Sequence, residues 1–523
     1  MSSHVFSSLA LTYLCSSSSS SAASSSKSTF DGVYATAHDA EVYASILSQA
    51  TAGNHSCVGR KPILVAQPAS VGDVKRVLAL TQAWVREGNG NVDAPPLCIC
   101  GGGHSELCVL EGAILLHMKR LNDVHVDVGA QTVTIGPGVT LGDVQEEAAK
   151  HGMAVPTGVF SGVGVGSILM GGVGRLARKH GLSVQNVVEL DMVTADGELH
   201  TLNAEAKGLD AELFWAARGA APALGVVTRI VVRAFNVSPD VVYGTAVVRL
   251  PPSAADRPLA DAAADKLAGI ERILRSLPEG QQVDLCLAPP TSAASDAGGI
   301  RLGIFPCSID GPFRSEDGEA IGFDVTKLGT LRFCDIPYHS MEEDADASPG
   351  ADTSSNDVEG AVSQASAGVF SYVRQRFVDE LGEEGMAILA AAASEAPTGD
   401  SLIMLQHCGG ATRRGGSRGL ETPRESLAFT PHDWEFSVVI IALWTDTSDD
   451  ARRDAMRWAD GAFNALQSHG AGLYAVDIDP FRRPSSTHDE VMQAYGDANL
   501  RRLRDLKQKV DPLGLFRGTV KLQ

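Results

Sequence analysis

The sequence predicts an α+β protein with two unlike domains, and three observations lead to this fold class. Strand-to-helix units recur between residues 62 and 150, and two glycine clusters lie at residues 101–105 and 158–174. Residues 237–470 then alternate strand-like runs with longer helices, which favours a second domain made of an antiparallel sheet backed by helices. A chain of 523 residues is also too long for one ordinary core, because domains usually contain about 100 to 200 residues.

The composition is that of a globular protein without a nucleic-acid partner. Hydrophobic residues make up 44% of the chain and charged residues 20%, near the averages for folded domains. The 43 basic and 63 acidic residues give a net charge of −20, which repels phosphate backbones. No stretch approaches the roughly 18 apolar residues of a spanning helix, so no membrane span is expected. The nine cysteines are odd in number and widely spread, and they predict no disulfide framework.

Two low-complexity segments are expected to lie outside the folded core. Residues 1–34 are rich in serine, and we interpret them as a disordered tail or a weak targeting segment. They lack the basic region of a secretory signal, so an intracellular location is favoured over secretion. Residues 342–359 are acidic and almost without large apolar side chains, which predicts a disordered surface loop inside the second domain.

The first strand-to-helix units carry recognisable helix starts. After the strand-like residues 62–65, Ser70 and Asp73 have the spacing of a capping box and predict a helix. The pattern recurs after the strand-like residues 132–135, where Thr140 and Asp143 predict a helix that runs through Lys150.

A strand pair and a final strand complete the first domain. Residues 187–194 and 198–202 flank Asp196-Gly197, a pair that supplies the positive backbone angles of a hairpin turn. A short helix over 210–217 and a strand over 225–233 follow. The first domain is therefore expected to span residues 35–236.

The two glycine clusters indicate a site for an anionic ligand. Glycine at this density lets backbone N–H groups approach a ligand closely, because no Cβ atom blocks the way. A pyrophosphate group is the ligand that such a site would bind. A Rossmann site is not favoured, because Pro156-Thr157-Gly158 precedes the second cluster where that fingerprint needs a strand.

Five motifs occur in the order in which they occur in one known family. They are Gly101–Ser105, Pro156–Gly174, Arg175–Leu182, Val193–Gly197, and Leu213–Gly219 with Gly225–Thr228. These residues resemble the FAD-binding domain of berberine bridge enzyme-like oxidoreductases, whose two-subdomain, PCMH-type fold is that of the vanillyl-alcohol oxidase superfamily. Residues 494–516 are similar to the family's closing motif, so the resemblance implies that the segment 471–523 returns to the FAD domain.

The resemblance implies FAD as the cofactor and assigns roles within the glycine clusters. His104 would be joined to the flavin through the 8α-methyl group. The place of the family's second linking residue, a cysteine, is taken by Phe160, so a single covalent bond is expected. Cys100 and Ile168 also depart from the family pattern. The residues expected to bind FAD are His104, Gly101, Gly102, Gly103, Ser105, Gly162, Val163, Gly164, Gly166, Ser167, Gly171, Gly172, Gly174, Gly225 and Val226.

A zinc site is an alternative interpretation of the first cluster. Cys98, Cys100, His104 and Cys108 are residues of the types that bind zinc. Zinc knuckles usually come as paired, short Cys-to-Cys spacings, and three glycines before His104 suit a flavin or a phosphate better. We therefore predict no metal site.

The second domain supplies the candidates for catalysis. The oxidation of an alcohol or an amine needs a general base, because hydride leaves carbon more readily as the attached proton departs. The family often uses a tyrosine from an Asn-Tyr pair, but the matching residues here are Tyr474-Ala-Val-Asp477-Ile-Asp479 and the usual tyrosine is missing. The candidates that remain are Tyr474, Asp477, His407 and His432, with Gln406 as a further polar group facing the substrate.

The resemblance implies an FAD-dependent oxidoreductase that takes a hydride from a small organic substrate, of the specialised-metabolite kind, and passes the electrons to oxygen. A carbohydrate oxidase is an alternative, but an aromatic content of only 6% does not favour its polar and aromatic groove. A second alternative is a non-redox cyclase or binding protein with the flavin fold, which the missing tyrosine favours. The sequence leaves the oligomeric state open.

Overall fold

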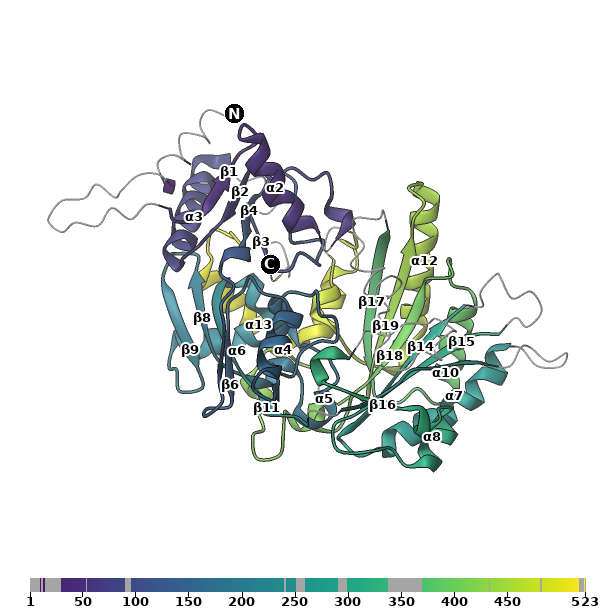
Figure 1. The fold of residues 1–523 in the computed structure, drawn as a ribbon. Helices are drawn as coiled ribbons and strands as arrows, with labels where there is room; N and C mark the ends of the chain where they lie inside the picture. The colour runs from purple at the N-terminus through teal and green to yellow at the C-terminus, as the bar shows by residue number, and fades with distance from the viewer. Residues whose placement is uncertain are drawn as a thin grey trace, which may run out of the picture.

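The computed structural model describes residues 30–52, 54–89, 96–238, 241–250, 259–289, 299–336, 369–431, 433–479 and 482–516, together with residues 10, 13, 14 and 522. The acidic segment 342–359 lies outside the described residues, as does most of the serine-rich start of the chain. The chain forms a mixed fold of helices and sheets in two halves, with the carboxy-terminal segment returning to the first half (Figure 1). The predicted fold class is confirmed.

The first sheet of the amino-terminal half lies between two helices. Its order is β1 (Val33–Ala35), β2 (Leu64–Gln67), β4 (Ile114–His117) and β3 (Leu97–Cys100), in which β2, β4 and β3 run parallel and β1 is antiparallel. Side chains alternate between the two faces of a strand. Leu64 and Ala66 therefore pack with α3 (Val71–Trp84), whereas Val65 packs with α2 (Ala40–Thr51). Ser70 caps α3 by accepting a hydrogen bond from the Asp73 backbone, as predicted.

The second sheet is antiparallel throughout and contains the predicted hairpin. Its order is β5 (Val124–Asp127), β6 (Thr132–Ile135), β10 (Gly225–Arg233), β8 (Val187–Thr194) and β9 (Leu199–Asn203). Gly197 turns β8 into β9 with a φ of +86°. The capping box of Thr140 and Asp143 begins α4 (Leu141–Ala149), and α6 (Leu209–Ala220) packs in the same core.

The carboxy-terminal half contains a nine-stranded antiparallel sheet among the described residues. Its order is β16 (Gly329–Leu331), β12 (Val241–Tyr243), β15 (Arg301–Ser308), β14 (Gln281–Ala288), β18 (Leu402–His407), β19 (Phe436–Trp444), β17 (Phe370–Val378) and β20 (Gly470–Leu473), and β13 (Ala246–Arg249) pairs with β15. The prediction of an antiparallel sheet is therefore confirmed.

The two faces of this sheet have different partners. One face packs in a single core with α7 (Leu259–Ser276), α10 (Gly382–Ser394) and α12 (Asp449–Ala465), the helices that back the sheet (Figure 1). The other face buries Met404 and Ile441 against Val159 and Phe160 of the amino-terminal half. This second face leaves room for a site between the halves.

The carboxy-terminal segment packs against the amino-terminal half. Helix α13 (Thr487–Val510) bends at Gly496, which has a φ of +70°. Lys507, buried near its end, pairs with Asp511 at 2.5 Å and donates to the Ala223 carbonyl at 2.6 Å.

Shorter elements are β7 (Met153–Ala154), β11 (Phe235–Asn236), α5 (Ala177–His180), α8 (Ser315–Ile321) and α11 (Ala411–Arg414). No helix of the described residues is both long and apolar enough to cross a membrane.

Candidate functional site

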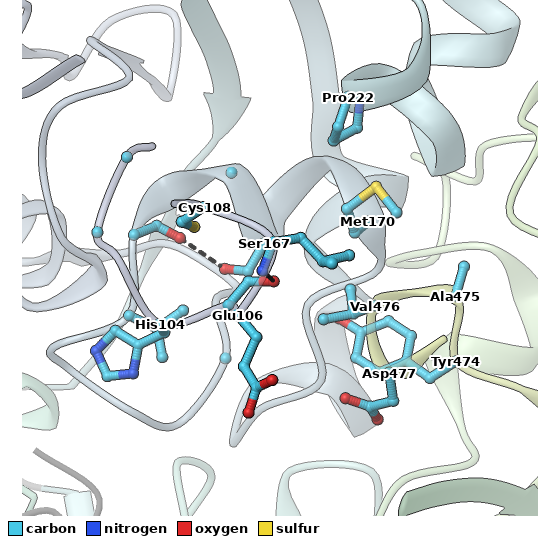
Figure 2. A pocket seen from close by; sticks show the side chains of 18 of the residues that line it. His104, Glu106, Cys108, Ser167, Met170, Pro222, Tyr474, Ala475, Val476 and Asp477 are labelled. Carbon is cyan, nitrogen blue, oxygen red and sulfur yellow. Dashed lines mark hydrogen bonds between the residues drawn. The ribbon is translucent and has the colours of Figure 1, made fainter. Parts of the chain in front are cut away.

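A cavity of about 530 Å³ lies where the two halves meet, within the size range of small-ligand and cofactor sites. The amino-terminal half contributes the two glycine clusters, and the nine-stranded sheet contributes side chains of β17, β18 and β19. The third wall is the short turn Tyr474–Asp479 (Figure 2). The chain segments that the sequence singled out thus meet around one space.

The two glycine clusters touch each other, and the contact leaves no room for side chains. A Cβ atom on Gly102 would lie 2.3 Å from the backbone nitrogen of Gly164, and one on Gly164 would lie equally close to the nitrogen of Gly102. Gly103 has a φ of +75°, and its Cβ atom would lie 2.6 Å from the Ala50 carbonyl oxygen. Glycine is therefore a steric requirement at these positions.

His104 lies on the cavity wall at the junction of the two clusters (Figure 2). The Asn54 side chain donates a hydrogen bond to the His104 backbone carbonyl at 3.0 Å and so holds the loop. On the other side of the imidazole, a Cβ atom at Gly162 would lie 3.4 Å from the His104 Nε2 atom. The imidazole is thus placed by its backbone and by the second glycine cluster.

The residues of the cavity fit an FAD molecule. The glycine walls allow backbone groups to approach a pyrophosphate. A Cβ atom added at Gly166 would meet no atom within 4 Å, so the backbone there borders open space. Of the residues expected to bind FAD, those that line the cavity are Gly101, Gly102, Gly103, His104, Ser105, Val163, Gly164, Gly166, Ser167, Gly172 and Gly225.

The other expected FAD residues lie behind the cavity wall. Gly171 makes room for Tyr474, because a Cβ atom there would lie 2.6 Å from the tyrosine ring. Gly174 lies against the Thr157 carbonyl, and Val226 is buried in the core around the first sheet. Gly162 lies beside His104 and outside the lining. These residues shape the wall and do not face the cavity.

The positions that depart from the family pattern differ in their surroundings. Phe160 lines the cavity and packs against the nine-stranded sheet. Ile168 is fully buried in the main core. Cys100 is also buried, and its thiol donates to the Ala50 carbonyl at 3.6 Å. Among the described residues, no group of three His, Cys, Asp or Glu side chains is arranged to hold a metal ion.

Tyr474 is held against the second glycine cluster. Its Oη atom accepts a hydrogen bond from the Gly172 N–H group at 2.9 Å. Its ring makes edge contacts with Phe377 and Phe429, at centroid distances of 5.7 and 6.4 Å. Burial raises the pKa of the Tyr474 phenol well above its ordinary value, so the side chain stays neutral at physiological pH.

Asp477 is a titratable group of the cavity wall (Figure 2). Its Oδ2 atom is buried and accepts no hydrogen bond from the described residues. Burial raises the pKa of the carboxyl from 3.8 to about 7, although Arg483 and Arg374 lower it in part. The guanidinium of Arg483 donates to the Asp477 backbone carbonyl and not to the carboxylate. A proton can therefore enter or leave this carboxyl near neutral pH.

A cluster of charges joins the His104 loop to the carboxy-terminal turn. Arg482 pairs with Glu106, two residues after His104, and its Nε atom lies 3.9 Å from Asp479. Arg60 lies 3.8 Å from the Glu106 carboxylate on the other side. Burial raises the pKa of the Glu106 carboxyl, whereas Arg482 lowers it. The pairing fixes the loop and the turn relative to each other, and the sequence pattern did not reveal it.

The sheet contributes a mostly apolar wall with a few polar groups. Gln406 lines the cavity as expected, and the Ser437 hydroxyl donates to its Oε1 atom at 3.1 Å. Gln375 lies on β17, on the far side of β19, and donates a hydrogen bond to the same Ser437 hydroxyl. Sequence reasoning missed it, because only strand pairing brings the two glutamines to one hydroxyl group. Met404, Val439 and Ile441 give this wall apolar surface, and Ser371, Tyr372 and Val373 of β17 also line the cavity.

One of the four candidate bases, His407, lies away from the cavity, and the position of another, His432, is not tested. His407 is fully buried outside the lining, because it follows Gln406 on β18 and neighbouring residues of a strand face opposite ways. Arg178 lies 2.6 Å from its Nε2 atom and Glu435 lies 3.4 Å away. Burial lowers the pKa of His407 to about 4. His432 lies outside the described residues.

Comparison with known proteins agrees with the glycine-lined site. Residues 62–203 match the family model of an FAD binding domain. An FAD-linked oxidoreductase of Dictyostelium discoideum is 22% identical over 88% of this chain and 89% of its own length. (R)-6-hydroxynicotine oxidase of Paenarthrobacter nicotinovorans is 35% identical, but the match covers only 35% of this chain and 38% of that protein.

Solved structures of low sequence identity to this chain share its fold. Berberine bridge enzyme from Eschscholzia californica has a TM-score of 0.71, with 15% identity over 94% of this chain and 97% of that one. At such identity the likeness concerns the fold.

Proposed function

We propose that this chain, an FAD-linked oxidoreductase with the fold of the berberine bridge enzyme-like proteins, is an oxidase in which Asp477 acts as the general base. The substrate is a small organic molecule that lies between the glycine clusters and the nine-stranded sheet. Asp477 takes the proton of its hydroxyl or amino group as a hydride leaves the neighbouring carbon, and molecular oxygen is the final electron acceptor.

The observation that carries this proposal is the Asp477 carboxyl. It lies on the cavity wall with a buried oxygen that lacks a hydrogen-bond partner among the described residues. A pKa of about 7 makes the carboxylate basic enough to accept a proton and leaves much of it ionised at neutral pH. Tyr474 is a less suitable base, because its raised pKa keeps the phenol protonated.

FAD bound in the cavity supplies the two-electron acceptor for this chemistry. The contact between the backbones of Gly102 and Gly164 forms the part of the cavity wall that would hold the FAD. His104 is the residue proposed to carry the covalent bond to the flavin, and Phe160 leaves no thiol at the family's second linking position. The paired charges of Glu106 and Arg482 keep the loop that bears His104 in place.

The other wall supports a substrate with an apolar body. Met404, Val439 and Ile441 offer apolar surface, and the amides of Gln375 and Gln406 orient a polar substituent. This composition favours a specialised-metabolite type of substrate over a carbohydrate, whose many hydroxyl groups would need more polar partners. The turn Tyr474–Asp479 then places the base beside the reacting atoms.

A comparison of two carboxylate variants tests the proposal. Aromatic N-methylamines, benzylic alcohols and monosaccharides are screened for anaerobic bleaching of the flavin, and the best substrate is carried forward. Asp477→Asn should retain flavin and slow its reduction by roughly 10²- to 10⁴-fold, the usual contribution of a general base. Asp479→Asn is the matched control, because Asp479 lines the cavity beside Arg482. Reduction of the Asp477→Asn protein at the parent rate would refute the assignment.

A further inference from the structure

Two glutamines of the cavity wall are joined through one buried hydroxyl group. Ser437 lies on β19, between the strands β17 and β18 that carry Gln375 and Gln406 (Figure 1). The Gln375 Nε2 atom donates a hydrogen bond to the Ser437 Oγ atom, and the Ser437 hydroxyl donates to the Gln406 Oε1 atom at 3.1 Å. Ser437 is fully buried, and the two glutamines are only 7% and 6% exposed. A chain of two hydrogen bonds therefore crosses three strands of the sheet.

This chain uses one end of each amide group and leaves the other end open. Among the described residues, the Gln375 Oε1 atom and the Gln406 Nε2 atom have no hydrogen-bond partner. Both residues line the cavity, and neither of these atoms is closed off from it. A buried amide group without a partner costs free energy, so buried amides are usually paired. The two open ends are thus places where a ligand would gain hydrogen bonds.

The Ser437 hydroxyl decides which kinds of atom stay open. A hydroxyl group has one hydrogen, so it donates to one glutamine and accepts from the other. If both amides were turned over, the two hydrogen bonds would run the opposite way, and the cavity would still meet one carbonyl oxygen and one amino group. The wall therefore presents one acceptor and one donor in either case.

The surroundings of the pair favour a neutral ligand group. Val439 lies between the two glutamine strands, paired with Gln375 on one side and with Met404 on the other, and both Val439 and Met404 line the cavity. A charged group loses much more free energy than a neutral one when it leaves water for such apolar surroundings. A carboxylate also offers only acceptors and an ammonium group only donors, so either would leave one glutamine unpaired.

We propose that Gln375, Ser437 and Gln406 form a recognition site for a neutral carboxamide or lactam group of the substrate. The Gln375 Oε1 atom accepts a hydrogen bond from the N–H group of the ligand, and the Gln406 Nε2 atom donates to its carbonyl oxygen. Ser437 is a positioning residue, since it does not line the cavity and acts through the two glutamines. The inference rests on the proposed function for the substrate's place in this cavity, but not for Asp477 as the base.

Binding of two pairs of isosteric molecules to the purified, flavin-loaded protein tests the proposal. Benzamide and δ-valerolactam carry both groups, whereas acetophenone and cyclohexanone keep the carbonyl oxygen and have carbon in place of nitrogen. Titration calorimetry and the change in flavin absorbance give the Kd of each molecule without turnover. We expect each amide to bind roughly 10-fold or more tightly than its ketone, because the ketone leaves the Gln375 oxygen unpaired. Ketones that bind as tightly as the amides, or amides that do not bind, would overturn the proposal.

Two serine variants give a second readout. Ser437→Ala removes the hydroxyl that joins the glutamines, so both amide groups can turn and the preference for amides over ketones should largely disappear. Ser401→Ala is the matched control and should keep the parent's preference, because Ser401 is an equally buried hydroxyl beside β18 that lies outside the cavity lining. An unchanged preference in Ser437→Ala, or its loss in Ser401→Ala, would contradict the role of Ser437. Because no turnover is measured, failure of Asp477 as the base would leave these results unchanged.

Discussion

Arg483 donates a hydrogen bond to the backbone carbonyl of Asp477, whereas the Oδ2 atom of the Asp477 carboxylate has no hydrogen-bond partner among the described residues. The remaining donors of Arg483 go to the Tyr372 hydroxyl at 2.8 Å and to the Glu490 carboxylate at 3.2 Å. The guanidinium is thereby occupied, and the Asp477 side chain is fixed in place without losing its basicity. A direct ion pair would hold the pKa of Asp477 low and weaken it as a base.

The rate of flavin reduction should depend on pH through Asp477. A base must be ionised to accept a proton, so the anaerobic rate should rise with pH through about 7 and level off above it. In Asp477→Asn the rate should be low and lack this rising limb. Stopped-flow reduction across the pH range measures both profiles. A limb near 7 that persists in the variant would assign it to another group.

The same carboxyl should destabilise the folded protein at high pH. The folded state keeps the Asp477 proton up to about pH 7, whereas the unfolded chain releases it near 3.8. The unfolded state therefore binds fewer protons between these values, and stability falls as the pH rises from about 4 to 7.

Asp477→Asn removes that cost. The variant should be more stable than the parent, and this difference in the free energy of unfolding should be larger at about pH 8 than at about pH 5 by roughly 1–3 kcal/mol. Urea unfolding at the two pH values measures this gain, and Asp479→Asn, whose side chain lies near Arg482, is the control. If the gain in the free energy of unfolding were the same at pH 5 and pH 8, the Asp477 carboxyl would not have a raised pKa in the folded protein.

Two glycines of the cavity should respond differently to alanine. In Gly102→Ala the new Cβ atom would lie 2.3 Å from the Gly164 nitrogen, so the two loops must separate. We expect flavin to be lost and the fold to be weakened by roughly 1–3 kcal/mol. In Gly166→Ala the Cβ atom meets nothing within 4 Å, so the fold should hold while flavin binding weakens.

The ratio of flavin to protein absorbance and thermal unfolding separate these two outcomes. Gly72→Ala is a control inside α3, where a Cβ atom would lie 3.5 Å from the Ser70 hydroxyl, an ordinary contact. Full flavin content in Gly102→Ala would mean that the contact between the two glycine clusters is not part of the FAD site.

Local signals in the sequence predicted much of the fold. Ser70 and Thr140 cap their helices as their spacing indicates, because a cap depends on residues only three apart. The Asp196-Gly197 turn also depends on its own few residues, and Gly197 has the positive φ that the hairpin needs. The glycine clusters predicted the cavity wall, because backbones that approach each other closely require glycine, and glycine is visible in the sequence.

Long-range pairing could not be predicted in this way. Strand β17, which brings Gln375 to the Ser437 hydroxyl that also binds Gln406, was not predicted from the sequence, and its neighbours β19 and β20 lie far along the chain. His407 was expected at the cavity because it follows Gln406, but strand alternation turns it into the core. The missing partner of Asp477 and the pairing of Glu106 with Arg482 are likewise products of tertiary structure.

If the glycine-lined cavity holds FAD attached through His104, the flavin must stay with the denatured chain. An absorption spectrum of the purified protein, recorded before and after acid precipitation, shows whether it does. We expect a flavin spectrum that stays with the precipitated parent protein and passes into the supernatant in His104→Ala. A parent protein without flavin absorbance would contradict the assignment of the cavity, and flavin released entirely into the acid supernatant would contradict the bond to His104.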